Sequence, residues 1–135
     1  MSVSPTFNIF RQPIFSEQGG RLFAIQHGQH ELFDFRRVFF IEGISGSKRG
    51  EHAHKSCFQW LCVLSGKVKI TLKDGIEIHS LAHTGFGEII LVNPGLWVEI
   101  DFLESGIVAA GANELYDESD YIRNWEEFLH FRGIS

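Results

Sequence analysis

The sequence predicts an all-β fold, a sandwich or barrel of short strands. Turn signals built from glycine, asparagine, aspartate and proline recur about every 8–12 residues, the spacing expected for such a fold. The segments between the turns are short and rich in valine, isoleucine, phenylalanine and leucine, which favour pleated strands. With 135 residues, the chain is long enough for one core and too short for two, so residues 1–135 are expected to form a single domain.

The clearest strand is 67–73, in which three aliphatic residues alternate with lysine and threonine. This period of two predicts a strand with one buried face and one exposed face. Asp74-Gly75 follows and predicts a two-residue hairpin turn, with a return strand that starts at Ile76 and keeps the same alternation.

Residues 58–64 are apolar on both faces and predict a strand that is covered on both sides. One face would look into the interior of the barrel. The other face would be covered either by a partner subunit or by the neighbouring sheet of the same chain, and the sequence leaves both possibilities open.

The C-terminal segment 116–131 differs in character from the rest of the chain. Acidic and hydroxyl side chains come first, and apolar residues then follow at roughly helical spacing from Ile122 to Phe131. This order is typical of a capped helix start, so we expect one short C-terminal helix.

The composition excludes several classes of function. A net charge of −5 leaves no basic footprint for nucleic acid or for an anionic membrane. The apolar runs, such as 89–92, are far shorter than the roughly 18 residues of a membrane span, and the N-terminus lacks a signal-peptide pattern. We therefore expect a cytoplasmic protein, with Cys57 and Cys62 as two buried free thiols.

The most informative residues are His52 and His54, which are separated by one alanine. On a strand they point to the same face, because side-chain direction alternates. Two imidazoles on one face form either half of a metal site or an acid–base pair for proton transfer.

The surrounding sequence resembles the metal-binding motifs of cupins, small β-barrels that hold a metal with three histidines and a glutamate. Here Gln59 stands at the glutamate position and Val98 at that of the third histidine. An amide and a valine are poor substitutes for a carboxylate and an imidazole. We therefore predict no metal and no other cofactor, with a metal-dependent cupin enzyme as an alternative.

Most of the chain resembles one cupin family in particular. The segments Arg49-Gly-Glu-His-Ala-His-Lys55 and 116–123, together with Gln59, Gly66 and Trp97, resemble the WxcM-like nucleotide-sugar 3,4-ketoisomerases. The resemblance implies a cupin jelly roll (a double-stranded β-helix) that forms a homodimer without a metal. It also implies a dTDP-linked 4-keto-6-deoxy sugar as substrate, whose ketone moves from C4 to C3 in the synthesis of 3-aminated sugars of surface polysaccharides.

The same resemblance implies roles for individual residues. His52 and His54 would be the catalytic pair that moves protons through an enediol, with His54 favoured as the base at C3. Arg37 and Arg49 would hold the diphosphate, because a guanidinium group pairs with phosphate in a bidentate manner.

Two further residues, Gln59 and Trp97, are expected at the substrate. Gln59 would bind a sugar hydroxyl, and Trp97 would be either a cavity wall or part of the core. Residues 116–123 would cap the helix and tie it to the barrel.

The chain departs from the family pattern at four positions. Phe39 and Phe40 stand where tyrosines are common, Gln26 replaces a glutamate, and Val98 replaces a histidine. These departures leave open a different nucleotide sugar, a different product stereochemistry, or a cupin that binds nucleotide sugars without catalysis.

Overall fold

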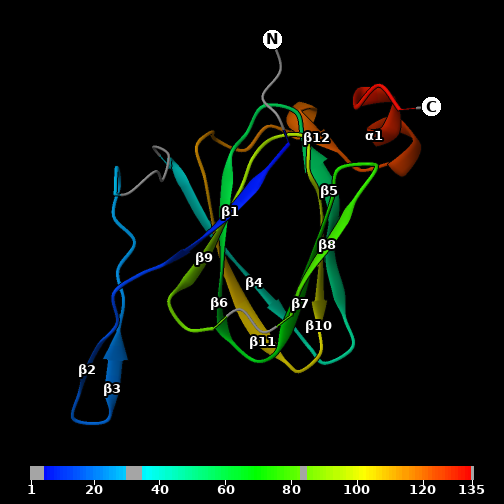
Figure 1. The fold of residues 1–135 in the computed structure, drawn as a ribbon. Coiled ribbons are helices and arrows are strands. Elements are labelled where there is room, and N and C mark those ends of the chain that lie inside the picture. Colours follow the sequence, from blue (N-terminus) through cyan, green and yellow to red (C-terminus); the bar gives the residue numbers. More distant parts are fainter. Residues whose placement is uncertain (1–4, 30–34, 83–84, 135) are drawn as a thin grey trace.

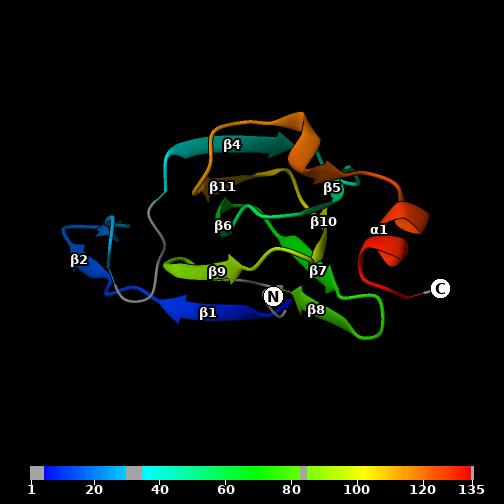
Figure 2. The ribbon, with the colours of Figure 1, turned by 90° about the horizontal axis from the view of Figure 1, so that it is seen from above.

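The computed structural model describes residues 5–29, 35–82 and 85–134. Two five-stranded sheets face each other and form a sandwich (Figures 1 and 2). The first sheet has the order β1 (Phe7–Arg11), β9 (Glu88–Val92), β6 (Gln59–Ser65), β11 (Gly106–Ala112) and β4 (Arg37–Gly43). The second sheet has the order β12 (Tyr121–Ile122), β5 (Lys48–His54), β10 (Trp97–Phe102), β7 (Val68–Lys73) and β8 (Ile78–Ala82).

The remaining elements lie outside the two sheets. Strands β2 (Phe15–Glu17) and β3 (Gly20–Leu22) form a hairpin that projects from the sandwich (Figure 1). A short 3₁₀ turn, η1 (Glu118–Asp120), precedes β12, and one helix, α1 (Trp125–Phe131), follows it. All strand pairs in the described ranges are antiparallel, which agrees with the predicted all-β jelly roll carrying a short C-terminal helix.

The core fills the space between the sheets. Strand β7 contributes Val68, Ile70 and Leu72, which are the three aliphatic residues of the predicted alternation, and all three are buried. The alternate residues of β10 and β6 meet them from the neighbouring strand and from the opposite sheet. Each such side chain contributes about 1.5–3 kcal/mol when it leaves water, so this layer holds the sheets in register.

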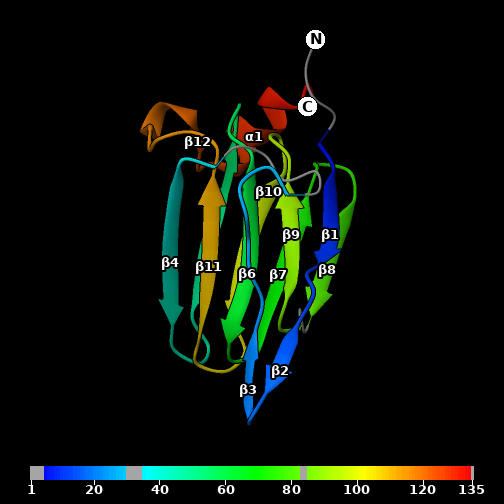
Figure 3. The same cartoon turned by 90° about the vertical axis from the view of Figure 1, so that its left-hand side faces the viewer.

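The outer face of β6 is covered by the chain itself. Trp60 and Cys62 pack against an N-terminal stretch that crosses the first sheet (Figure 3) and contributes Phe10, Phe23, Ile25 and Phe35. The prediction that this strand is covered on both sides is confirmed. The covering residues belong neither to a partner subunit nor to the second sheet, the two expected possibilities. They precede β4 in the same chain.

Two local predictions are wrong in detail. The β7–β8 connection is a four-residue loop, Asp74–Glu77, in which the N–H of Asp74 donates to the carbonyl of Glu77 over 3.3 Å, and not a two-residue turn. The C-terminal helix begins only at Trp125, since the side chain of Asn124 caps it by accepting from the N–H of Glu127. Ile122, expected in the helix, lies in β12 and is fully buried.

Cys57 and Cys62 are buried and form no disulfide, as predicted. In the ranges that the structure describes, no helix has the length and apolar character needed to span a membrane.

Candidate active site

A β-bulge in β5 shapes the candidate site. Along the β5–β10 ladder, Arg49 pairs with Ile100 and His52 pairs with Val98, so one extra residue is inserted between them. Gly50 takes a φ of 83° and Glu51 a φ of 58° to accommodate it. Simple alternation would place Arg49 and His52 on opposite faces of the strand, and the bulge brings both to the inner face.

Glycine is required at position 50 of this bulge. A Cβ atom there would lie 2.8 Å from the carbonyl oxygen of Val98, and the positive φ disfavours other residues. In the Arg-Gly-x-His pattern, the glycine is therefore required by the backbone conformation of the bulge, and the arginine and histidine supply the chemistry.

His52 and His54 lie next to each other on the inner face of β5. Their ring centroids are 5.2 Å apart, and the ring of Tyr121 contacts both, at 5.0 Å from His52 and 4.4 Å from His54. Tyr121 reaches them because β12 pairs with the end of β5, with Tyr121 opposite His54. The histidine pair thus has a phenol as its neighbour.

Asp120 binds the Nδ1 atom of the His54 ring, on the opposite side of the ring from Nε2. The Nδ1 atom of His54 lies 2.8 Å from Oδ2 of Asp120, and both groups are buried. The other oxygen, Oδ1, accepts from the backbone N–H of Ser56 over 2.8 Å and from its hydroxyl over 2.9 Å. Since a carboxylate accepts, His54 carries its proton on Nδ1, and Nε2 keeps a free lone pair.

The electrostatics keep both histidines neutral at pH 7. Burial, together with the neighbouring His54, lowers the pKa of His52 from 6.5 to about 4. Burial also lowers the pKa of His54, although the hydrogen bond to Asp120 opposes the shift. Burial pushes the pKa of Asp120 up, but hydrogen bonds from His54 and Ser56 outweigh this and hold it below its usual value. A neutral imidazole beside a carboxylate is suited to accept a proton at Nε2.

An open pocket of about 600 Å³ lies between β4 and β5, beside the short edge strand β12. Its wall includes His52, Tyr121 and three cations, Lys48, Arg49 and Arg123, and also the carboxylates of Glu42 and Glu51. His54 lies behind this wall and is 4% exposed. These three cations form a cationic rim, but acidic groups lie beside them: Lys48 pairs with Glu99 and Asp101, and Arg123 pairs with Glu118. The guanidinium groups of the rim are the groups suited to an anionic ligand.

Arg37 and Gln59 also face the interior. Both belong to one row of the first sheet, since Ala112 pairs with Arg37 on one side and with Gln59 on the other. Arg37 donates from Nη2 to the hydroxyl of Tyr121 over 3.3 Å. The Nε atom of Arg37, Nε2 of Gln59 and Nε2 of His54 are buried polar atoms with no hydrogen-bond partner among the described residues. Buried polar groups are normally paired, so these three atoms are available to a polar ligand.

Trp97 does not line this site: of its two expected places, a cavity wall or the core, the structure shows the core, so its expected place among the substrate-binding residues does not hold. It lies on the outer face of the second sheet, because its neighbour Val98 faces inward opposite His52. The indole packs against Trp125 and Phe128 with ring centroids at 5.3 and 5.6 Å, and its N–H donates to Glu99 over 3.0 Å. Trp97 therefore joins α1 to the sandwich as a core residue.

Sequence reasoning assigned Asp120, Tyr121 and Arg123 to helix capping and missed their place beside the histidines. Arg123 stacks over the ring of Tyr121 at 4.4 Å and pairs with Glu118 over 2.7 Å. The available signal was the specific pattern of residues 116–123, in which acidic and aromatic residues follow no helical period.

Comparisons with known proteins identify the family of this chain. A family model described as "FdtA: WxcM-like, C-terminal" matches residues 6–133, nearly the whole chain. The chain belongs to the WxcM-like family. It is 34% identical over 114 residues to the TDP-4-oxo-6-deoxy-alpha-D-glucose-3,4-oxoisomerase of Aneurinibacillus thermoaerophilus, an alignment that covers 83% of this chain and 82% of that protein.

Solved structures of this WxcM-like family have the same fold. QdtA of Thermoanaerobacterium thermosaccharolyticum, a sugar 3,4-ketoisomerase crystallised with TDP, superposes with a TM-score of 0.88 at 28% identity over 94% of each chain. A 3,4-ketoisomerase of Helicobacter canadensis also gives 0.88, at 26% identity over 94% of this chain and 97% of that one. The TDP-quinovose 3,4-ketoisomerase WlaRB of Campylobacter jejuni gives 0.84 at 28% identity, over 92% of this chain and 97% of that one.

Proposed function

We propose that this WxcM-like protein is a 3,4-ketoisomerase that converts a TDP-linked 4-keto-6-deoxy sugar into its 3-keto isomer. The observation that carries the proposal is the His54–Asp120 pair, which presents a neutral imidazole with a fixed tautomer beside His52 and Tyr121. QdtA, which has the same fold, was crystallised as a histidine-to-asparagine mutant with TDP-4-keto-6-deoxyglucose. That sugar is therefore our proposed substrate.

The first half of the reaction removes the proton on C3. We assign this step to Nε2 of His54, whose lone pair is free because Nδ1 carries the proton that binds Asp120. The electron pair of the C3–H bond forms a C3–C4 double bond, and the ketone oxygen at C4 takes up a proton. The product of this half is an enediol. A positioned base contributes roughly 10²–10⁴-fold to such a step.

The second half returns a proton to C4. The hydroxyl on C3 loses its proton, its oxygen becomes the new ketone, and the double bond collapses onto C4, which is protonated. His52 is the proposed second carrier, since its ring lies 5.2 Å from that of His54 and adjacent strand positions suit adjacent ring carbons. The hydroxyl of Tyr121 accepts from Arg37 and keeps its own proton available for a sugar oxygen.

Binding of the nucleotide part is assigned to the cationic rim. Arg49 and Arg123 line the pocket mouth, and Arg37 lies deeper beside Tyr121. Guanidinium groups form bidentate, charge-assisted bonds with phosphate, so we place the diphosphate at this rim. Gln59 is proposed to bind a sugar hydroxyl through its buried, unpartnered Nε2.

We also propose that the protein is a homodimer. The β2–β3 hairpin projects from the sandwich (Figure 1) and exposes Ile14, Phe15 and Leu22, at 43%, 65% and 57%. Contiguous exposed apolar side chains of this size mark contact surfaces, and a second copy of the chain is the proposed partner. The two buried free thiols fit a reducing compartment, so we keep the proposal of a cytoplasmic location.

The histidine assignment is tested with His54→Asn. We expect turnover of TDP-4-keto-6-deoxyglucose to fall by about 10²–10⁴-fold, the contribution of a general base, while the dissociation constant for TDP stays within a few fold. If TDP binding falls as much as turnover, His54 is a binding or structural residue. If the unaltered protein binds TDP and turns over no sugar, it is a nucleotide-sugar-binding cupin.

A further inference from the structure

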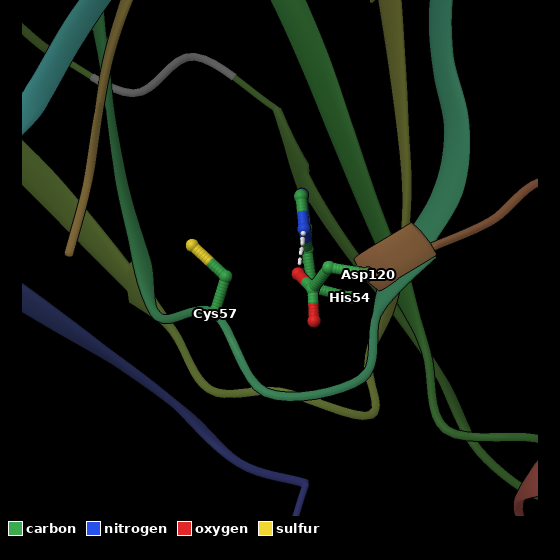
Figure 4. A group of neighbouring side chains, drawn as sticks. All are labelled: His54, Cys57 and Asp120. Carbon is green, nitrogen blue, oxygen red and sulfur yellow. Dashed lines mark hydrogen bonds and ion pairs between the residues drawn. The ribbon is translucent and has the colours of Figure 1, made fainter. Parts of the chain in front are cut away.

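A second group of chemically active atoms lies on the far side of His54. One imidazole nitrogen of His54, the Sγ of Cys57 and a carboxylate oxygen of Asp120 all lie within 4.8 Å of one another (Figure 4). Nδ1 is the nitrogen that faces Asp120, at 2.8 Å from Oδ2. His54 ends β5, Cys57 follows in the loop before β6, and Asp120 ends η1. All three side chains are buried, with exposures of 4%, 3% and 9%. The proposed isomerisation has no use for a thiol at this place.

We propose that His54, Cys57 and Asp120 form a Zn²⁺ site. One imidazole nitrogen, one thiolate and one carboxylate oxygen are a donor set that zinc binds, and the sulfur disfavours Mg²⁺ and Ca²⁺. Three protein ligands are the number found at zinc sites that keep a fourth position for water. This donor set differs from the histidine pair of metal cupins, because it uses Nδ1 of His54 and no atom of His52.

The surrounding contacts prepare the cluster for this ion. Ser56 holds Oδ1 of Asp120 through two hydrogen bonds, which leaves Oδ2 directed at His54. The thiol of Cys57 donates a long contact of 3.4 Å to the carbonyl of Phe58. Burial raises the pKa of this thiol, while backbone N–H groups of Glu114 and Asn113 stabilise its thiolate. In a tetrahedral site with bonds of about 2.0–2.3 Å, ligand atoms lie about 3.3–3.8 Å apart. The 2.8 Å His54–Asp120 contact must therefore open slightly and the thiol must move inward.

Zinc binding requires one proton to leave and one to move. The Cys57 thiol loses its proton to solvent as Sγ binds, and the proton on Nδ1 of His54 is replaced by one on Nε2, so that Nδ1 of the neutral imidazole binds the ion. With Nε2 protonated, His54 cannot act as the base. Given the proposed function of His54, zinc at this site inhibits isomerisation, and the cysteine makes the enzyme sensitive to zinc.

Metal binding is measured directly on chelator-treated protein. Zn²⁺ is titrated by calorimetry, and Co²⁺ replaces it as a spectroscopic probe of sulfur ligation. We expect one ion per chain and a thiolate-to-cobalt charge-transfer band in the near ultraviolet. Cys57→Ser should lose that band and bind Zn²⁺ at least about tenfold more weakly, a loss of about 1.4 kcal/mol. Cys62→Ser is the matched control, since it removes the other buried free thiol, on β6, and should change neither result.

Two results would overturn the proposal. One is a cobalt spectrum of the unaltered protein without the thiolate band. The other is equal zinc affinity in both cysteine variants, which would place the ion on surface histidines. Cys57→Ala is a second variant should the serine perturb folding, and circular dichroism checks each protein. These binding measurements use no sugar, so their outcome does not depend on whether the protein is an isomerase. In a turnover assay, zinc should inhibit both the unaltered protein and the Cys62→Ser variant. It should not inhibit the Cys57→Ser variant. Equal inhibition of all three would contradict the assignment.

Discussion

Asp120→Asn is the substitution that most directly tests how the site sets the tautomer of His54. In the unaltered protein, Oδ1 of Asp120 is fixed by two donors from Ser56, and Oδ2 faces Nδ1 of His54. The amide of asparagine must keep its oxygen toward Ser56, because both groups there donate. Its NH₂ then faces His54 and forces Nδ1 to accept, which moves the imidazole proton to Nε2.

The expected cost follows from that proton. With Nε2 protonated, His54 cannot remove the C3 proton, so kcat should fall by about 10²–10⁴-fold, the range for loss of a general base. Mere loss of one hydrogen bond to a charged group, about 1.5–3 kcal/mol, would cost only about 10–100-fold. Asp120→Ala leaves His54 free to adopt either tautomer, and should therefore be less impaired in kcat than Asp120→Asn.

The assay is steady-state turnover of TDP-4-keto-6-deoxyglucose together with a TDP binding titration. Asp117→Asn is the matched control, because Asp117 is an exposed aspartate of the same segment whose carboxylate accepts from the backbone N–H and the hydroxyl of Ser119, and asparagine is an equally good N-cap for η1. It should keep kcat within a few fold. An Asp120→Asn variant with nearly normal kcat, or one impaired only in TDP affinity, would refute the tautomer argument.

Three further predictions concern binding, pH and assembly. Arg49→Ala should raise the dissociation constant for TDP by about 10–100-fold, as expected for a lost charge-assisted bond. Arg11, which pairs with Glu88, is the control, and Arg11→Ala should leave the dissociation constant unchanged in the same titration. Because folding lowers the pKa of His52 from 6.5 to about 4, its contribution to stability is present above pH 6.5 and is lost as the pH falls toward 4. Urea unfolding should show this loss, which is at most about 3.4 kcal/mol at 1.36 kcal/mol per pKa unit. His52→Asn should reduce the loss, and an unchanged pH profile of stability in that variant would contradict the shift. The double substitution of Phe15 and Leu22 by serine should convert a dimer to monomers in light scattering, whereas Ile76→Ser, at a residue that is 79% exposed on the β7–β8 loop, should not.

Much of the fold could be predicted because periodicity reports on burial. The alternation in β7 gives its buried face, and the apolar run of β6 gives its double cover. The nature of that cover could not be predicted, since a pattern of buried residues does not reveal which segment packs against them. The loop Asp74–Glu77 was missed because the Asp-Gly pair suits several turn lengths, and the backbone of both Ile76 and Glu77 donates to the Asp74 carboxylate.

The site was predictable only where the side chains share one strand. His52 and His54 fall on one face by simple alternation, but Arg49 joins them through a bulge that period-two reasoning does not include. The two alternatives for Trp97 were left open because the sequence does not show which face of its strand looks inward; the structure gives the inward position to Val98 and the outer core to Trp97. Asp120 and Tyr121 come from a segment far along the chain, and only the pairing of β12 with β5 brings them to the histidines.

The measurement that tests the central claim most directly is a proton NMR time course in D₂O. Chelator-treated protein is mixed with TDP-4-keto-6-deoxyglucose, and the sugar resonances are followed. Isomerisation through an enediol predicts a 3-keto product that carries deuterium at C4, and its ring couplings give the configuration of that carbon. Persistence of the 4-keto sugar, with TDP binding still detectable, would contradict the proposed isomerisation of this sugar.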